Sequence, residues 1–180
     1  MSELSLPHEA RAGPTKPPVR AVVMEALGVG PPDHFVDVGS CTGAMTIEGS
    51  LRTDLVTAIE RDPDRVRVTE RNLRANDATE GVTVLNEEAP AGLPPDGDVL
   101  FIGGSREFDA VLEQAIEYDY DRIGMTVSRL EVAGKATTAF KERGLLSELL
   151  QLQVSQGYEL AGAMSFRSNN PVFFLLGEPS

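Results

Sequence analysis

The sequence has few residues that could cross-link the chain or bind a metal. It contains one cysteine, Cys41, so no disulfide can form within the chain. Its two histidines, His8 and His34, lie far apart and, together with a single cysteine, match no metal-ligand spacing. We therefore expect neither a disulfide nor a bound metal, and we expect both histidines to be exposed and without a role.

Long apolar runs are also missing. No stretch reaches the roughly eighteen uninterrupted apolar residues of a membrane span, and the first eighteen residues lack the apolar core of a signal peptide. These absences predict a cytoplasmic protein with no membrane partner. At 180 residues, 41% of them hydrophobic, the chain is long enough for one compact domain and too short for two ordinary ones.

Lysine is scarce, and acidic residues outnumber basic ones. Only three of the 16 basic residues are lysines, and 28 acidic residues give a net charge of −12. Such a protein repels a polyanion, which argues against a nucleic-acid partner. Many carboxylates and few lysines indicate a halophile, whose self-repelling surface is stable only when salt screens it. An ordinary acidic protein from a GC-rich genome is the alternative.

The chain divides into an arm and one domain. Residues 1–18 hold four of the twelve prolines and no apolar period, so we expect an extended N-terminal arm followed by a single domain of residues 19–180. From Val19 onward, helix and strand patterns alternate. Strands are expected at 34–38, 55–59, 82–85, 98–102 and 122–127, and helices at about 19–27, 44–52, 63–76, 107–117 and 130–143.

The predicted order indicates a parallel sheet with an antiparallel end. Short apolar strands that alternate with helices favour right-handed parallel crossovers. Residues 145–155 and 171–176 are two further strand candidates, with only a loop expected between them. We expect the two strands to pair antiparallel at one edge, where 171–176 would offer a place for association. Five parallel strands plus an antiparallel β-β edge predict an α/β fold, the Rossmann-like sheet of class I S-adenosylmethionine-dependent methyltransferases. Three methionines are expected to fill the core: Met45, Met125 and Met164.

A glycine-containing turn follows the first predicted strand and opens a helix. In an open α/β sheet the ligand lies beyond the carboxyl ends of the strands. Glycines let the backbone approach that ligand, and free N–H groups at a helix start favour a carboxylate or a phosphate. The residues of this turn expected to contact a cofactor are Gly39, Ser40, Cys41, Thr42 and Gly43.

An acidic residue at the end of the second predicted strand indicates which kind of ligand the glycine turn binds. Glu60 follows Gly39 at about the 20-residue spacing at which a carboxylate accepts hydrogen bonds from a ribose diol. The alternative is that Glu60 only caps the next helix, for which Asp62 is better placed. Glu88 and Ala89, at the end of the third strand, are expected to flank an adenine ring. Together these residues predict an adenosyl cofactor.

NAD(P) is the competing ligand. A dinucleotide-binding Gly-x-Gly-x-x-Gly turn needs its second glycine against the pyrophosphate, and Cys41 occupies that position. A methionine carboxylate demands a less close approach, so S-adenosylmethionine is the expected cofactor. Asp37, at the strand end, is expected to orient the turn and to lie within reach of the ligand's amino group.

Five motifs together resemble a known family. The segments 13–17 (GPTKP), 37–43 (DVGSCTG), 87–90 (EEAP), 101–105 (FIGGS) and 170–173 (NPVF) are similar, in order, to those of the precorrin C15-methyltransferases (decarboxylating) of the cobalamin pathway. The resemblance spans about residues 13–177. The sequence differs from the family at Cys41, where glycine is usual, and at residues 125–128, which read MTVS where the family often has NAVT.

The resemblance implies a reaction and a substrate. It implies methylation of C15 of a cobalt-precorrin, a tetrapyrrole, with decarboxylation of the acetate side chain on C12. It also implies a homotetramer and a contact between Thr15 and the cofactor, in addition to the turn, Glu60 and Ala89. The exact precorrin, its cobalt status and the order of the two steps are left open.

The expected chemistry needs few special side chains. Methyl transfer from a sulfonium is an in-line displacement that depends mainly on orientation, and the tetrapyrrole ring can take up the electrons released by loss of CO2. No catalytic residue is therefore assigned. A substrate with many carboxylates needs local donors, and the candidates near the cleft are Ser105, Arg106, Thr126, Arg129 and Arg167. For each arginine, a plain surface charge is the alternative.

Two other functions compete. A tRNA or rRNA base methyltransferase would share this fold, but the acidic charge opposes it. So does the Ile-Gly-Gly-Ser segment at 102–105, where amino-methylating enzymes tend to carry Asn or Asp followed by Pro-Pro and an aromatic residue. The other alternative is a binding module that keeps the cofactor pocket as a sensor without turnover.

Overall fold

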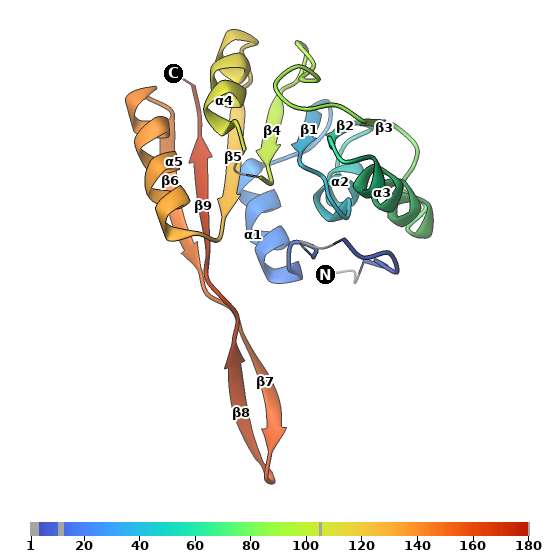
Figure 1. Ribbon diagram of the computed structural model, residues 1–180, viewed down its shortest axis with the longest axis vertical. Helices are drawn as coiled ribbons and strands as arrows, with labels where there is room; N and C mark the ends of the chain where they lie inside the picture. Colours follow the sequence, from blue (N-terminus) through green and yellow to red (C-terminus); the bar gives the residue numbers. More distant parts are fainter. Residues whose placement is uncertain (1–3, 11–12, 105, 180) are drawn as a thin grey trace.

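The computed structural model describes residues 4–10, 13–104 and 106–179 (Figure 1). Up to the fifth strand its helices and strands alternate, except that no helix lies between the third and fourth strands, at residues 86–98. Each of the ten segments predicted up to residue 143 is present within a few residues of its expected bounds. In chain order the elements are α1 (Pro17–Leu27), β1 (His34–Val38), α2 (Ala44–Ser50), β2 (Leu55–Ile59), α3 (Pro63–Ala75), β3 (Val82–Leu85), β4 (Val99–Ile102), α4 (Phe108–Glu117), β5 (Arg122–Val127), α5 (Leu130–Glu142), β6 (Leu146–Leu152), β7 (Ser155–Leu160), β8 (Ala163–Ser168) and β9 (Val172–Gly177).

Seven of the strands within the described residues form one sheet. Its order is β3-β2-β1-β4-β5-β9-β6, with β1 to β5 parallel and β9 antiparallel to both β5 and β6. The five parallel strands and the antiparallel β-β end are confirmed. The expectation that residues 171–176 form an edge was wrong, because β9 inserts between β5 and β6 and leaves β6 at the edge.

Helices cover both faces of the sheet because the central strands are apolar on both sides. The side chains of Phe35 and Phe101 pack in a cluster with α1. Their neighbours Val36 and Leu100 point to the opposite face, into a cluster with α4 and α5. This alternation places α1, α2 and α3 on one face and α4 and α5 on the other (Figure 1). None of the helices in the described part of the chain has both the length and the apolar run that a bilayer crossing requires.

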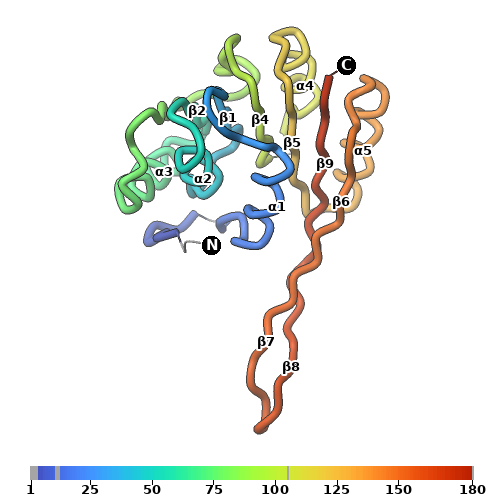
Figure 2. Tube along the Cα trace, turned by 180° about the vertical axis from the view of Figure 1, so that it is seen from behind, coloured from blue at the N-terminus to red at the C-terminus, as the bar shows by residue number. Residues whose placement is uncertain are grey.

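A second, two-stranded sheet extends from the body of the protein. β7 and β8 pair antiparallel and form a hairpin. This hairpin projects away from the main sheet beyond the ends of β6 and β9, as both views show (Figures 1 and 2). The sequence was expected to form a loop here, and that expectation was wrong. Met164 was also wrongly placed in the core, because it lies on β8 and is 71% exposed, whereas Met45 and Met125 are buried as expected.

His34 is buried rather than exposed. It starts the central strand β1 and keeps only 5% of its surface accessible. Its Nε2 atom lies 2.9 Å from the Thr57 hydroxyl, and its Nδ1 atom lies 3.2 Å from the Asp96 carbonyl oxygen. The ring is therefore a satisfied polar group at the amino end of the sheet, away from the strand ends where a ligand is expected.

The N-terminal arm has neither helix nor strand in its described stretches, 4–10 and 13–16. It ends at Lys16, because α1 begins at Pro17 with proline in its first turn. The arm is nevertheless in contact with the domain. Leu4 and Leu6 pack against a small apolar cluster built on α2 and α3.

Candidate functional site

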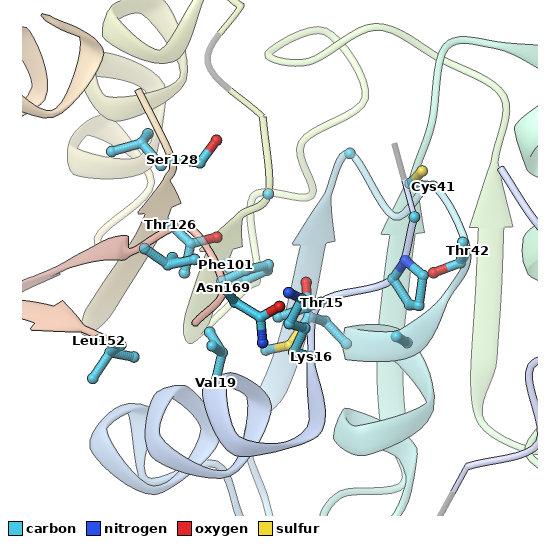
Figure 3. A pocket seen from close by; sticks show the side chains of 18 of the residues that line it. Thr15, Lys16, Val19, Cys41, Thr42, Phe101, Thr126, Ser128, Leu152 and Asn169 are labelled. Carbon is cyan, nitrogen blue, oxygen red and sulfur yellow. The ribbon is translucent and has the colours of Figure 1, made fainter. Parts of the chain in front are cut away.

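One cavity lies at the carboxyl ends of β1, β4 and β5 (Figure 3). Its volume is about 680 Å³, within the usual range of small-molecule sites. Four parts of the chain line it: the arm and α1, the glycine turn with the start of α2, the ends of β4 and β5, and the base of the hairpin. The lining residues are Gly13, Pro14, Thr15, Lys16, Val19, Asp37, Gly39, Ser40, Cys41, Thr42, Ala44, Met45, Phe101, Gly103, Thr126, Val127, Ser128, Leu152, Val154, Ser168, Asn169, Asn170 and Val172.

The glycine turn after β1 is held against two neighbouring strand ends. The Gly39 amide donates a hydrogen bond to the Ile59 carbonyl at 2.8 Å, and the Gly103 amide donates one to the Val38 carbonyl at 2.8 Å. A Cβ atom on Gly103 would lie 3.3 Å from the Gly39 carbonyl oxygen, and Gly39 itself has a φ of +82°. Glycine at these two positions lets the segments after β1 and β4 pack closely at the mouth of the cavity.

Cys41 adopts a backbone conformation suited to glycine. Its φ is +57°, in the left-handed region that L residues with a Cβ rarely occupy. Glycine, which the resemblance implies at this position, adopts such a conformation without strain. The Cys41 amide donates a hydrogen bond to Oε2 of Glu60 at 3.2 Å, so the turn after β1 is joined to the end of β2.

Glu60 lies behind this turn rather than on the cavity surface. Only 4% of the residue is exposed, and its Oε1 atom accepts a second hydrogen bond, from the Asp62 amide at 3.0 Å. Asp62 is the N-cap of α3, and its side chain accepts from the Asp64 amide at 2.9 Å. The capping role thus belongs to Asp62, and the Glu60 carboxylate connects two loops directly below the turn.

Asp37 is the ionisable group with the most altered acidity in the cavity. It is 1% exposed, and its Oδ2 atom accepts a hydrogen bond from the Thr46 hydroxyl at 2.6 Å. Burial raises the pKa of Asp37 to about 7, and the negative charge of nearby Glu60 adds to this increase, while the hydrogen bond from Thr46 opposes it. Burial therefore favours the protonated form of this carboxyl group over the range in which an exposed aspartate is charged.

The cavity brings together most of the turn and two residues from distant segments. Thr15 and Thr126 line it together with Gly39, Ser40, Cys41 and Thr42. In Figure 3, Thr126 and Ser128 lie on one side of the arm residues, and Cys41 and Thr42 lie on the other. Gly43 is buried as the N-cap of α2, and it lies behind the lining.

The residues after β3 lie apart from this cavity. Neither Glu88 nor Ala89 is among the described residues that line it. The Glu88 side chain is half exposed and lies 3.5 Å from an Arg61 nitrogen and 3.6 Å from an Arg106 nitrogen. These are exposed ion pairs of small energy, so the Glu88 side chain can be displaced at little cost.

The candidate arginines also lie outside the lining. Arg106 is exposed beside Glu88, and Arg129 is exposed at the N-cap of α5. Arg167 lies on β8, where its guanidinium stands 5.1 Å from the centre of the Tyr158 ring. Ser105 lies outside the described residues.

Several lining residues were missed by sequence reasoning. Lys16 is the one cation among the described residues around the cavity, and Ser128, Asn169 and Asn170 add neutral hydrogen-bonding groups. Lys16 and Asn170 lie within the GPTKP and NPVF motifs, so a signal for these two existed in the sequence. No group of three metal-ligating side chains was found among the residues that the structure describes.

Comparison with known proteins places these features in one family. The model of the precorrin methyltransferase domain matches residues 9–176. A relative from Halobacterium salinarum named "Probable cobalt-precorrin-6B C(15)-methyltransferase (decarboxylating)" is 58% identical over 180 residues, which cover all of this chain and 96% of the relative. A Salmonella typhimurium protein named "Cobalt-precorrin-6B C(15)-methyltransferase (decarboxylating)" is 32% identical over 167 residues, covering 89% of this chain and 86% of that protein.

A solved structure agrees with these relatives. The crystal structure of a protein described as precorrin 8W decarboxylase from Methanobacterium thermoautotrophicum superposes with a TM-score of 0.88 at 30% identity, covering 94% of this chain and 95% of that one. The similarity therefore extends over the arm, the sheet and the hairpin rather than over the glycine turn alone. The chain belongs to the precorrin methyltransferase family.

Proposed function

We propose that the protein is a methyltransferase of cobalamin biosynthesis, which methylates C15 of a cobalt-precorrin and removes the C12 acetate group as CO2. One observation carries this proposal. Three family motifs that are far apart in sequence, at residues 13–17, 37–43 and 170–173, contribute to the lining of a single cavity. The relatives named for this reaction match nearly the whole chain, which supports the same assignment.

The residues around the glycine turn fit S-adenosylmethionine. The backbone of the turn borders the cavity and would receive the methionine carboxylate, with Thr15 opposite. Asp37 would pair with the ammonium group, which favours the charged form of a carboxyl whose pKa burial has raised. Glu60 would accept hydrogen bonds from the ribose hydroxyls in place of the one that it accepts from the Cys41 amide. Glu88 and Ala89 would flank the adenine.

The protein's contribution to the reaction is orientation and exclusion of water. Bound S-adenosylmethionine supplies an activated methyl group. Apolar side chains at the ends of β4 and β5 and at the base of the hairpin form the apolar part of the cavity lining, namely Phe101, Val127, Leu152 and Val154. The tetrapyrrole ring takes up the electrons released when CO2 leaves, so no strong base is needed.

The carboxylates of the substrate need donors. Lys16, Thr126 and Ser128 line the cavity and would hold the nearest of them. The exposed arginines Arg106 and Arg129, together with Arg167 on the hairpin, would bind the more distant carboxylates outside the cavity. Ser105 is proposed as a further donor to these carboxylates.

The hairpin supports the proposal of a homotetramer. β7 and β8 expose Leu160, Met164 and Phe166 on a projecting element. Met164 and Phe166 lie two residues apart on β8 and so share one face, and exposed apolar side chains grouped in this way are typical of an association site. We place the enzyme in the cytoplasm with its biosynthetic relatives, in a halophilic cell, and without a nucleic-acid partner.

The direct test is mass spectrometry of a cobalt-precorrin mixture incubated with the protein and S-adenosylmethionine in molar KCl. The expected product has gained one methyl group and lost one CO2. Glu60→Ala should abolish this product, whereas Glu113→Ala, which removes an exposed acid on α4, should not. Cofactor binding without a change in any precorrin would overturn the proposal, and methylation of added tRNA instead would favour the base methyltransferase.

A further inference from the structure

An irregular segment forms one wall of the cavity. Residues 13–16, the end of the N-terminal arm, line it without helix or strand to fix them (Figure 3). A segment of this kind would ordinarily be mobile, and its ordering would oppose ligand binding. The arm must therefore be held by side chains from the domain, and two groups of contacts do this.

The first group holds the start of the arm. Asn72 lies in the last turn of α3, and Asn76 is the C-cap of that helix. Asn72 accepts from the His8 amide at 3.1 Å and donates to the His8 carbonyl at 2.9 Å, and Asn76 does the same for Ser5 at 2.9 and 2.6 Å. Asn72 also donates to the Thr42 carbonyl at 2.9 Å. The arm and the glycine turn are thus fixed by the same side chain.

The second group holds the cavity wall itself. Arg20, on α1, is only 2% exposed, and its Nη1 atom donates to the Thr15 carbonyl at 2.7 Å. Its Nε atom donates to Glu48 at 3.1 Å, and Arg52 donates to the other oxygen of Glu48 at 2.8 Å. A guanidinium buried in this way is held in one geometry by its partners. It therefore fixes the backbone of Thr15, beside Lys16.

We infer that Arg20 is a positioning residue for ligand binding: it touches no ligand, but it holds the wall of residues 13–16 in the binding conformation. The inference rests on the proposed function, because it takes this cavity as the S-adenosylmethionine site. With Arg20 in place, the wall is ordered when the protein folds. Without it, the ordering cost of about one residue falls on the binding step, which corresponds to about a tenfold weaker affinity.

Arg122 offers a matched control. It is also a largely buried arginine that donates to backbone carbonyls, those of Leu27 and Gly28 at 2.8 Å each, and to a carboxylate, that of Asp33 at 2.8 Å. These contacts hold the opposite end of α1, at the amino ends of the strands and away from the cavity. Loss of either arginine lowers stability, but only Arg20 acts on the cavity wall.

The experiment measures the Kd of S-adenosylmethionine by titration calorimetry in molar KCl for the wild type, Arg20→Met, Arg20→Lys and Arg122→Met, with a thermal melt of each. We expect Arg20→Met to raise the Kd about tenfold, Arg122→Met to leave it within about twofold, and both to lower the Tm. Arg20→Lys keeps a charge beside Glu48 and should give an intermediate Kd while still folding.

The outcomes separate the two proposals. If Arg20→Met binds S-adenosylmethionine as tightly as the wild type, the positioning role is overturned and the proposed cofactor stands. If Arg20→Met does not fold, the same comparison is made with Arg20→Lys. Equal weakening by Arg122→Met would also overturn the positioning role, because the effect would then be general instability. If the wild-type protein fails to bind S-adenosylmethionine, the proposed function fails, and this inference fails with it.

Discussion

At the scale of single residues, Cys41 carries a side chain where the backbone favours none. A left-handed conformation costs an L residue roughly 1–2 kcal/mol compared with glycine, and the φ of Cys41 is +57°. The hydrogen bond from its amide to Glu60 keeps the backbone in this conformation. The strain is therefore located within the proposed cofactor turn.

Replacing this side chain should change stability in a predictable direction. We expect Cys41→Gly to be more stable than Cys41→Ala by about 1 kcal/mol, because glycine removes the strain while alanine keeps it. Urea unfolding in molar KCl measures the difference. Equal stabilities of the two variants would show that the turn relaxes around a Cβ atom.

Asp37 links stability to pH. Its pKa is raised by burial from the ordinary 3.8 to about 7 in the folded protein. Between these values the folded chain binds a proton that the unfolded chain has released, so the contribution of Asp37 to stability falls as pH rises. This loss is complete only above about pH 7, where the buried carboxylate is charged.

Asp37→Asn should remove this pH dependence. The amide oxygen can still accept from Thr46, but no charge develops inside the protein. We expect the difference in unfolding free energy between the variant and the wild type to shift in favour of the variant from pH 5 to pH 8. Urea titrations at several pH values measure it, with Asp64→Asn, an exposed position on α3, as the control. A difference that is constant with pH would contradict the raised pKa.

The candidate site was predictable where it depends on strand ends. Gly39 and Thr126 follow from the rule that ligands lie beyond the carboxyl ends of parallel strands, and the structure places both on one cavity. Ser168 and Asn169 reach the same cavity from the hairpin base, and no local sequence pattern predicts such long-range packing. The buried orientation of the Glu60 carboxylate likewise depends on two loops that meet only in the folded protein.

At the scale of elements, the hairpin was missed because its turn lacks the usual signal. The two turn residues, Ala161 and Gly162, both have positive φ, at 51° and 79°. Such turns usually carry Asn-Gly or Asp-Gly, and alanine at the first position does not suggest one. The flanking apolar residues alternate, but they are exposed, so no core pattern marked the strands.

The antiparallel pairing of β6 and β9 was predictable, but their order in the sheet was not stated correctly. β9 has consecutive buried residues, Phe174, Leu175 and Leu176, as expected of a strand covered on both faces with neighbours on both sides. β6 mixes apolar and polar residues and is largely exposed, as an edge strand can be. The compositional difference between the two strands was thus the signal for their order.

The hairpin should determine the oligomeric state. Met164 and Phe166 are each 71% exposed, so their replacement by serine leaves the packing within the chain intact. We expect the wild-type protein to sediment as the proposed tetramer and the Met164→Ser, Phe166→Ser double variant to sediment as a smaller species, with both measured by sedimentation velocity in molar KCl. Leu130→Ser, which removes an exposed apolar side chain on α5, is the control. The same mass for all variants would exclude the hairpin as the association site.

At the scale of the whole molecule, charge should set the response to salt. A net charge of −12 on 180 residues produces repulsion, which acts over about 10 Å in 0.1 M salt and about 3 Å in 1 M salt. We expect the Tm to rise between low salt and molar KCl. A variant that neutralises three exposed acids, Glu9→Gln, Glu80→Gln and Glu159→Gln, should melt at a higher temperature than the wild type in low salt.

High salt should remove this advantage. If screening is the mechanism, the melting temperatures of the variant and the wild type converge in molar KCl, because repulsion no longer separates them. A Tm of the wild-type protein that does not change with salt would contradict the halophile hypothesis.

The insertion of β9 between β5 and β6 also affects how the protein is made. Translation delivers β5 and β6 before the strand that joins them, so the nascent chain cannot complete its sheet until Val172 and the residues after it have left the ribosome. Until then, two strands carry unpaired backbone groups of the kind that promotes aggregation. A chain released before Val172 therefore keeps both open edges and becomes a substrate for chaperones and proteases.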